Sequence, residues 1–343
     1  MIKKHSIKES KLYKLYSKST LANLLGCSNN FINYFNNNRN HYHNRFEPKK
    51  SGRGKREVNN PGASLKNMHR RLLGILKQIE PPAYLKSGVK GISVADIANL
   101  HKMCNYMLCL DISSFYRYAR IEYVRKLFIT EFKMAPNLAE FISKLVTIPS
   151  EDKKTQYIPT GSPISQIIVF WAYKHTFDEI DTIAKQNDIK FSLYVDDMTF
   201  SSEKNIPKSF EYFVMKRLKS VGLNVKLEKT KRYGPTDDKV TVGVQITKKH
   251  EIKITDKNRY KIISFMTKQG RISTWTFDLL IKCRGMIVAA QQKEPNFMMT
   301  TKKRLDAEIK KYKQSNPMCT KRTTETKTNK NKIKTLPTFD NHN

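Results

Sequence analysis

Two adjacent aspartates, Asp196 and Asp197, are the side chains of this sequence best suited to chemistry. Strand-forming residues stand on both sides of the pair, Ser-Leu-Tyr-Val before it and Met-Thr-Phe after it, and they predict a hairpin with both carboxylates at its tip. Neighbouring carboxylates raise each other's pKa unless a cation neutralises them. A Lys or Arg could do so in a structural ion pair, and Mg²⁺ could do so while also binding substrate phosphates.

A third aspartate, Asp111, favours the metal over the ion pair. It belongs to a short apolar run, residues 106–112, that predicts a buried strand. An aspartate in such a place is costly unless it binds a ligand or caps the backbone. If this strand lies beside the hairpin, three carboxylates converge, and such a site can bind two metal ions for phosphoryl transfer. Spacing alone leaves paired structural aspartates open as the alternative.

The elements that must position these aspartates are predicted to be helices and strands in an α+β arrangement. Apolar residues at helical spacing predict a helix over residues 64–79, with Ser64 as its N-cap. Further helices are expected over residues 21–26, 30–35, 121–133, 164–185 and 210–221, and after Thr255. Strands are expected over residues 106–112, 191–194, 198–201, 240–246 and 251–254.

The charge of the chain indicates a polyanionic partner. Its 343 residues carry 64 Lys and Arg against 30 Asp and Glu, a formal net charge of +34, and 39% hydrophobic residues suffice for a packed core. The excess is spread along the chain and densest at both ends, which favours nucleic acid over a membrane surface. No apolar run approaches the length of a spanning helix, and no secretory signal is recognisable, so a cytoplasmic protein with no membrane partner is expected.

Five ordered motifs resemble those of reverse transcriptases, specifically the bacterial retron type, from about residue 46 to 254. Tyr-Val-Asp-Asp at 194–197 resembles the palm hairpin of these enzymes, and Leu-Asp-Ile-Ser-Ser-Phe-Tyr at 110–116 resembles their first palm strand. Residues 158–166 (IPTGSPISQ) resemble the template-handling segment, with Thr160 in place of the usual Gln and Gln166 in place of the usual Pro. Residues 222–230 (GLNVKLEKT) and 49–73 resemble the segment with the conserved Lys and the fingers segment.

The resemblance implies a right-hand polymerase fold of the α+β class, with fingers, a palm whose antiparallel sheet packs on helices, and a helical thumb. The implied boundaries are a basic helical extension at 1–45, fingers at 46–105, a palm that includes fingers elements at 106–254, an RNA-binding thumb at 255–313 and a basic flexible tail at 314–343.

The resemblance also implies the roles of individual residues. Asp111, Asp196 and Asp197 would be catalytic and hold two Mg²⁺ ions, for which Mn²⁺ could substitute, while a primer hydroxyl attacks a dNTP. The nucleotide-binding residues would be Arg56 and Lys50 on the triphosphate, Tyr116 as the gate against a 2′-hydroxyl, Thr160 and Gly161 at the nascent base pair, and Lys229 as the acid for pyrophosphate. A generic strand-end lysine is the alternative for Lys229.

Retron features are present in altered form. Ile-Ala-Asn-Leu-His at 97–101 keeps the Ala and His of a family motif, and Thr-Val-Gly at 241–243 keeps the Gly of another. His101 and Gly243, with Arg271 and Arg284 of the thumb, are therefore expected to contact RNA, although a lone helical His is usually a packing residue.

The implied function is that of an RNA-directed DNA polymerase that reads a dedicated structured noncoding RNA. Synthesis would start from a guanosine 2′-hydroxyl and leave a branched RNA–DNA hybrid, and a separate effector protein would act with it in defence against phage. Another bacterial reverse transcriptase, intron-derived or of an unknown defence group, stays open as an alternative. A non-catalytic RNA-binding scaffold is the rival from another class, and the three intact aspartates argue against it.

Overall fold

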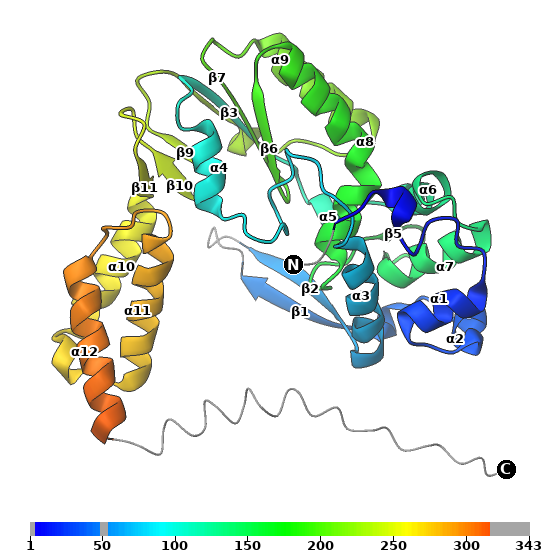
Figure 1. Cartoon of the computed structure of the whole chain (residues 1–343), viewed down its shortest axis with the longest axis horizontal. Coiled ribbons are helices and arrows are strands. Elements are labelled where there is room, and N and C mark those ends of the chain that lie inside the picture. The colour runs from blue at the N-terminus through cyan, green and yellow to red at the C-terminus, as the bar shows by residue number, and fades with distance from the viewer. Residues whose placement is uncertain (1–3, 49–53, 316–343) are drawn as a thin grey trace. The chain divides into compact units, whose positions relative to one another are not determined.

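The computed structural model describes residues 4–48 and 54–315, which fall into two separately packed units. The first unit runs to Val242 and also includes residues 246–250, and the second comprises residues 243–245 and the chain from Glu251 onward. Figure 1 labels the elements of both.

A four-stranded antiparallel sheet lies at the centre of the first unit. Its strands are β6 (Lys190–Tyr194), β7 (Asp197–Ser202), β3 (Tyr106–Asp111) and β8 (Lys231–Tyr233), in that order across the sheet. The first three were predicted to within one or two residues, because most residues of their apolar runs are buried. The sheet therefore places the end of β3 beside the start of β7.

Helices cover this sheet and complete the larger core. The long α8 (Ser165–Gln186) contacts β6 and α9 (Lys208–Ser220), and α4 (Val94–His101) also contacts β6 (Figure 1). Phe170, Tyr173 and Phe177 of α8 are buried in the core. Both α8 and α9 match their predicted ranges, whereas α4 was not predicted.

The remaining helices of this unit differ in part from their predictions. They are α1 (Lys18–Leu25), α2 (Asn29–Tyr34), α3 (Ala63–Leu76), α5 (Phe115–Tyr118), α6 (Ile121–Lys126) and α7 (Pro136–Val146). The prediction of Ser64 as an N-cap is wrong, because α3 begins one residue earlier and Gly62 is its N-cap. The helix expected over residues 121–133 instead passes from α6 into a π-helical turn, Leu127–Glu131.

Two small hairpins stand outside the central sheet. The first pairs β1 (Tyr42–Pro48) with β2 (Lys55–Pro61), and the second pairs β4 (Ile148–Pro149) with β5 (Gln156–Tyr157). Neither was predicted, since β1 exposes most of its side chains on both faces and lacks an alternating apolar pattern.

The second unit contains the helices α10 (Asp256–Gln269), α11 (Phe277–Gln291) and α12 (Met299–Ser315). Trp275, Leu280, Ile287 and Leu305 belong to its separate core. The strand expected over residues 240–246 is divided into β9 (Lys239–Thr241) and β10 (Val244–Ile246), because Val242 and Gly243 both adopt positive φ, 42° and 73°. The last strand, β11 (Ile252–Ile254), was predicted.

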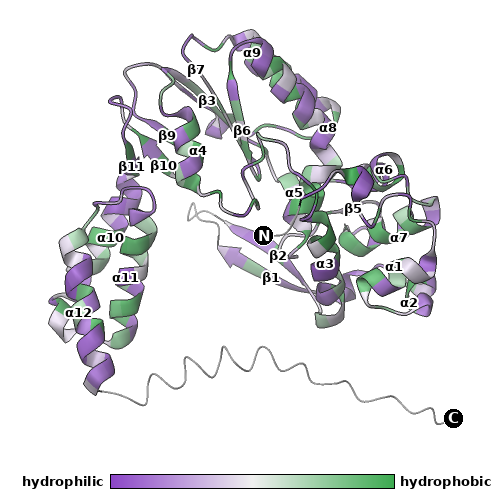
Figure 2. Ribbon diagram, in the orientation of Figure 1, coloured by the Kyte–Doolittle hydropathy of each residue, from purple (hydrophilic) through white to green (hydrophobic). Residues whose placement is uncertain are grey.

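Hydrophilic and hydrophobic residues alternate along the helices in Figure 2. Within the described part of the chain, no helix combines the length and the apolar character that a bilayer crossing requires. Most of the expected tail, residues 316–343, lies outside the described residues.

Candidate active site

Backbone pairing brings the three aspartates to one end of the central sheet. Asp111 closes β3 and lies directly opposite Asp197, the first residue of β7. Asp196 occupies the turn between β6 and β7, and its carbonyl oxygen accepts a hydrogen bond from the amide of Ile112 at 2.9 Å. The predicted convergence of the three residues is therefore built from ladder hydrogen bonds, which fix it independently of any side-chain contact.

The negative charges of the three aspartates are only partly balanced by nearby positive charge. Burial raises the pKa of Asp197 to about 6, and the charges of Asp196 and Asp111 add to this effect, while Lys229 opposes it. The pKa of Asp196 is also raised, again mainly by burial and then by Asp111. Because a raised carboxyl pKa reports a destabilised anion, this site favours the arrival of a cation.

Lys229 supplies the one cation that directly contacts an aspartate of this group within the described residues. Its Nζ lies 2.7 Å from Asp111 Oδ2, and its side chain remains 52% exposed. Burial lowers the pKa of Lys229, but the hydrogen bond to Asp111 and the three carboxylate charges outweigh it, so that the net shift is upward. The Lys226 amide donates to the Asp111 carbonyl at 2.8 Å, which holds this segment against β3.

An open cavity of about 280 Å³ borders Asp111, Asp197 and Lys229. Three carboxylates are suitable donors for a hard divalent cation, which takes oxygen ligands. In the described residues, however, no three acidic, His or Cys side chains are already grouped as a metal cage, and Asp111 is paired with Lys229. The donor set thus fits a divalent ion by its chemistry, and Lys229 occupies one of the two carboxylate oxygens of Asp111.

Tyr116 lies just beyond this cluster, in α5. Its neighbour Phe115 is buried in the core, while the Tyr116 ring is only half-buried. Burial raises the pKa of Tyr116 to about 12, and the charge of Asp196 contributes to this rise. The role of Tyr116 as a gate against a 2′-hydroxyl stays a prediction.

Thr160 and Gly161 pack against the β1–β2 hairpin. The Asn59 amide donates to the Thr160 carbonyl at 2.6 Å, and Thr160 Oγ1 donates to the Glu57 carbonyl at 2.6 Å. Gly161 adopts φ +97°, and a Cβ there would lie 2.7 Å from Val58 Cγ1. Only glycine therefore permits this close approach, and the Thr160 hydroxyl is bound to backbone in this structure.

A buried histidine that was not predicted supports the same loop. The Nδ1 atom of His69, in α3, lies 2.7 Å from Ser162 Oγ, and Nε2 lies 2.7 Å from the Leu145 carbonyl. Burial lowers the pKa of His69 to about 4, so the imidazole is neutral and donates from Nε2 to the carbonyl. Its position on the apolar face of a predicted helix could have indicated from the sequence that His69 is buried.

The remaining predicted residues lie in varied surroundings. Arg56 is exposed at 55% and forms an ion pair with Glu47 at 3.1 Å, and Lys50 lies outside the described residues. In the second unit, Arg271 is exposed, Arg284 pairs with Asp306, and the Gly243 carbonyl accepts from Lys293 Nζ at 2.9 Å.

The structure contradicts a direct RNA contact by His101. Its side chain is fully buried, with Nε2 2.8 Å from Ser192 Oγ and Nδ1 2.6 Å from Ser201 Oγ. The imidazole thus joins α4 to β6 and β7, and this packing role corrects the prediction.

Comparison with known proteins assigns the family. Residues 48–255 match the family described as reverse transcriptase (RNA-dependent DNA polymerase). The chain belongs to this family. Its fold is accordingly the right-hand polymerase fold of the α+β class, as predicted.

The curated relatives support the retron type. The chain is 24% identical over 245 residues to the retron Se72 reverse transcriptase of Salmonella heidelberg, a match that covers 68% of this chain and 63% of that protein. It is 25% identical over 275 residues to the retron Ec83 reverse transcriptase of Escherichia coli, covering 76% and 86%. The predicted resemblance to retron reverse transcriptases is thereby confirmed.

Solved structures of two telomerases are also similar. The apo telomerase of Candida tropicalis has a TM-score of 0.48 and 12% identity, covering 71% of this chain and 52% of that one. The telomerase of Candida albicans in complex with a fragment of telomeric RNA has a TM-score of 0.49 and 13% identity, covering 78% and 55%.

Proposed function

We propose that this chain is the RNA-directed DNA polymerase of a retron. The observation that carries the proposal is the strand register, which sets Asp111 opposite Asp197 with Asp196 in the adjoining turn. Two of these carboxyl groups have raised pKa values, as expected of a cluster that awaits cations. Membership of the reverse transcriptase family supports the same reaction.

Asp111, Asp196 and Asp197 would hold two divalent ions, Mg²⁺ or Mn²⁺. These ions would supply positive charge to the attacking primer oxygen and to the leaving pyrophosphate. The residues of the chain would orient the substrates. Arg56 and Lys50 would bind the dNTP triphosphate, and Thr160 and Gly161 would lie against the nascent base pair.

Two further side chains would act on the nucleotide. The ring of Tyr116, in the short helix α5 that follows the strand of Asp111, would occupy the space that a 2′-hydroxyl needs and so exclude ribonucleotides. Lys229 would donate its Nζ proton to the pyrophosphate as it leaves. Its contact with Asp111 supports this assignment, because it keeps the amino group protonated and within the site.

The chain would have the same subdomains as other right-hand polymerases. We assign residues 46–105 to the fingers, 106–254 to the palm and 255–313 to an RNA-binding thumb, preceded by a basic extension and followed by a basic tail. The exposed Arg271, together with Arg284 and the loop at Gly243, would contact RNA through phosphates and shape.

The template would be a structured noncoding RNA that also supplies the primer. The names of both curated relatives support the retron assignment. We propose that synthesis starts from a guanosine 2′-hydroxyl, leaves a branched RNA–DNA product, and serves a cytoplasmic antiphage system with a separate effector protein.

The polymerase assignment is tested with purified chain, oligo(dT) annealed to poly(rA), dTTP and Mg²⁺. The wild type should extend the primer, and Asp196→Asn should abolish extension. Asp188→Asn is the matched control, because Asp188 is exposed beyond the end of α8, and it should extend normally. Extension that survives Asp196→Asn would refute the site.

A second experiment separates a retron enzyme from other bacterial reverse transcriptases. The chain is expressed with its neighbouring genomic DNA, and the DNA product is isolated under denaturing conditions. We expect DNA that remains joined to RNA and is released by a 2′–5′ debranching nuclease. Free DNA alone would favour another reverse transcriptase, and the absence of any product would favour the scaffold.

A further inference from the structure

A short segment before α4 is bound along the edge of the catalytic hairpin. Leu85 forms a parallel bridge with Leu193 of β6. The Leu193 amide donates to the Tyr84 carbonyl at 2.8 Å, and the Lys86 amide donates to the Leu193 carbonyl at 2.9 Å. Residues 84–88, which we call the brace, therefore extend the sheet by a partial fifth strand beside the turn that carries the aspartates.

The brace ends on a strained residue of that turn. Val195, which directly precedes Asp196, adopts φ +60°. A β-branched residue is an outlier in this region, and such strain persists only when the surroundings enforce it. The Val195 amide donates to Ser87 Oγ at 3.0 Å. Ser87 is only 5% exposed, so this hydroxyl holds the amide in a place where water has little access.

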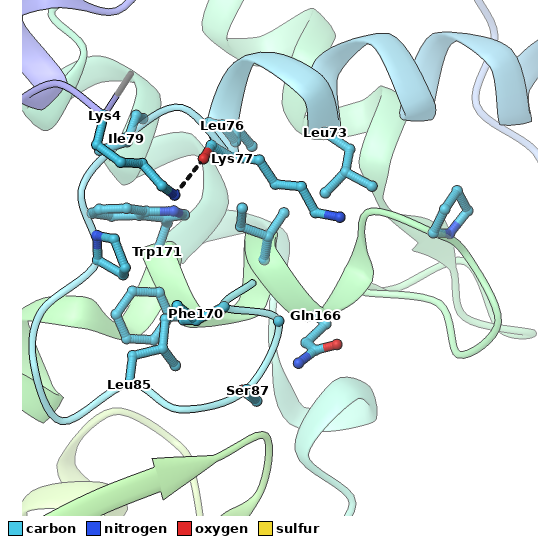
Figure 3. Close-up of a pocket in the computed structure, with 15 residues that line it drawn as sticks. Lys4, Leu73, Leu76, Lys77, Ile79, Leu85, Ser87, Gln166, Phe170 and Trp171 are labelled. Atoms are coloured by element: carbon cyan, nitrogen blue, oxygen red, sulfur yellow. Dashed lines mark hydrogen bonds between the residues drawn. The ribbon is translucent and has the colours of Figure 1, made fainter. Parts of the chain in front are cut away.

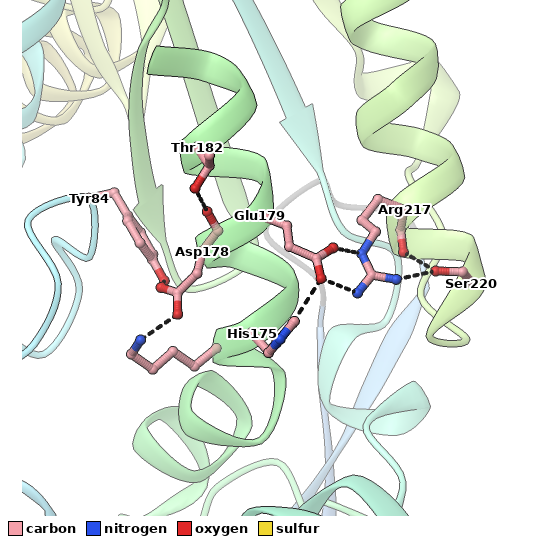
Figure 4. Close-up of polar contacts among 8 residues, drawn as sticks. Tyr84, His175, Asp178, Glu179, Thr182, Arg217 and Ser220 are labelled. Carbon is pink, nitrogen blue, oxygen red and sulfur yellow. Dashed lines mark hydrogen bonds and ion pairs between the residues drawn. The ribbon is translucent and has the colours of Figure 1, made fainter. Parts of the chain in front are cut away.

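The brace that carries Ser87 is held in place by contacts at its other end. At the start of the brace, the Tyr84 ring stacks on Phe191 at 5.2 Å and its hydroxyl donates to Asp178 Oδ1 of α8 at 2.7 Å (Figure 4). Leu85 and Ser87 of the brace line a cavity of about 110 Å³ together with Gln166 and Phe170 of α8, and Figure 3 shows Leu85 next to Phe170. The brace is thus anchored on α8 at one end and on the aspartate turn at the other.

We propose that Ser87 is a positioning residue for catalysis, which acts by holding Val195 in its left-handed conformation and so sets the direction of Asp196 and Asp197. Loss of the hydroxyl leaves the Val195 amide without its partner and lets the turn relax toward an ordinary conformation. The aspartates then stand less often in the arrangement that receives cations and substrate, although no group that touches substrate has been changed. This inference rests on the proposed polymerase function.

The test compares Ser87→Ala with the wild type in the primer-extension assay. We expect kcat to fall about tenfold, since one buried hydrogen bond is lost, while KM for dTTP stays within about twofold. Ser87→Thr keeps the hydroxyl and should retain most of the activity. Ser143→Ala is the matched control, because Ser143 is also buried and its hydroxyl donates to the Ala139 carbonyl within α7, and its kcat should equal that of the wild type.

A double variant tests whether the two residues act through each other. Glycine adopts positive φ without strain, so Val195→Gly removes the need for the hydroxyl bond. Ser87→Ala should therefore cost much less activity in the Val195→Gly background than in the wild type. Equal losses in both backgrounds, or an unchanged kcat in Ser87→Ala, would overturn the proposal.

Hydrogen exchange gives a readout that does not depend on activity. Amides of residues 194–198 should exchange faster in Ser87→Ala than in the wild type and stay unchanged in Ser143→Ala. Unchanged exchange in Ser87→Ala would overturn the inference even if the enzyme is active. If the wild type extends no primer, the proposed function fails, and faster exchange would still show that Ser87 holds the turn.

Discussion

Replacement of Gly161 by alanine should separate the loop 158–166 from the β1–β2 hairpin. The added Cβ would lie 2.7 Å from Val58 Cγ1, 3.1 Å from Asn60 Oδ1 and 3.2 Å from the Asn59 carbonyl. Val58 is 7% exposed and the carbonyl belongs to a paired strand, so neither neighbour can turn away freely. Either the hairpin or the loop must shift.

The magnitude follows from two contributions. A non-glycine residue at φ +97° costs about 2 kcal/mol, and the collision adds about 2 kcal/mol of overpacking. The sum, about 4 kcal/mol, should lower the unfolding midpoint by roughly 12 °C for a unit of this size. Because the loop borders the proposed nucleotide site, KM for dTTP should rise as well.

Gly91→Ala is the matched control for this experiment. Gly91 has φ +87°, but a Cβ there meets no atom within 4 Å. It should incur the conformational cost alone, roughly 6 °C, and leave KM for dTTP unchanged. Thermal unfolding and steady-state primer extension measure both effects. Equal shifts in the two variants would refute the close contact between loop and hairpin.

Three further predictions concern single side chains. Tyr116→Ala should raise the efficiency of ribonucleotide incorporation relative to dNTPs by at least about tenfold. Tyr118→Ala is the control, because Tyr118 is exposed, and an unchanged ratio in Tyr116→Ala would contradict the gate. Lys229→Met should lower kcat about hundredfold and remove the alkaline limb of the pH profile, and Lys229→Arg should stay impaired, since arginine keeps the ion pair but does not release a proton. Rescue by arginine would assign Lys229 to charge balance only. His69, whose pKa is lowered to about 4, binds its proton only in the unfolded chain between about pH 6.5 and 4, so stability should fall by about 2 kcal/mol from pH 7 to 5 in urea unfolding. His69→Gln should lose this part of the pH dependence, and an unchanged slope would contradict it.

The elements that the sequence predicts well are those with a buried face. The helix α8 and the strands β3, β6 and β7 bury apolar residues with clear period or as continuous runs. The hairpin β1–β2 was not predicted because β1 is mostly exposed and both strands are rich in polar residues. Its position depends on hydrogen bonds to Thr160, about a hundred residues away. The break between β9 and β10 was not predicted, because Val242 adopts a positive φ that is disfavoured for valine.

The same distinction applies within the site. The three aspartates were recognised from their type and their strand context, and the ladder register brings them together. Ser87 carried no such signal, because a serine between a lysine and a glycine resembles any turn residue. Its partner Val195 is 108 residues away, and only the folded chain shows that the hydroxyl meets that amide.

The Lys229–Asp111 ion pair explains how this chain can fold with three neighbouring carboxylates in place. Lys229 neutralises Asp111, the most buried of the three, while Asp196 and Asp197 retain raised pKa values. Because the lysine side chain is 52% exposed, the ion pair contributes at most about 1 kcal/mol, and under the proposed function its loss to a divalent cation would cost little. Lys229 also lines the cavity, where under the proposed function its ammonium group would meet a phosphate of the nucleotide. In a chain of net charge +34, the aspartates thus form a small acidic site whose charge is partly balanced by a lysine of the same site.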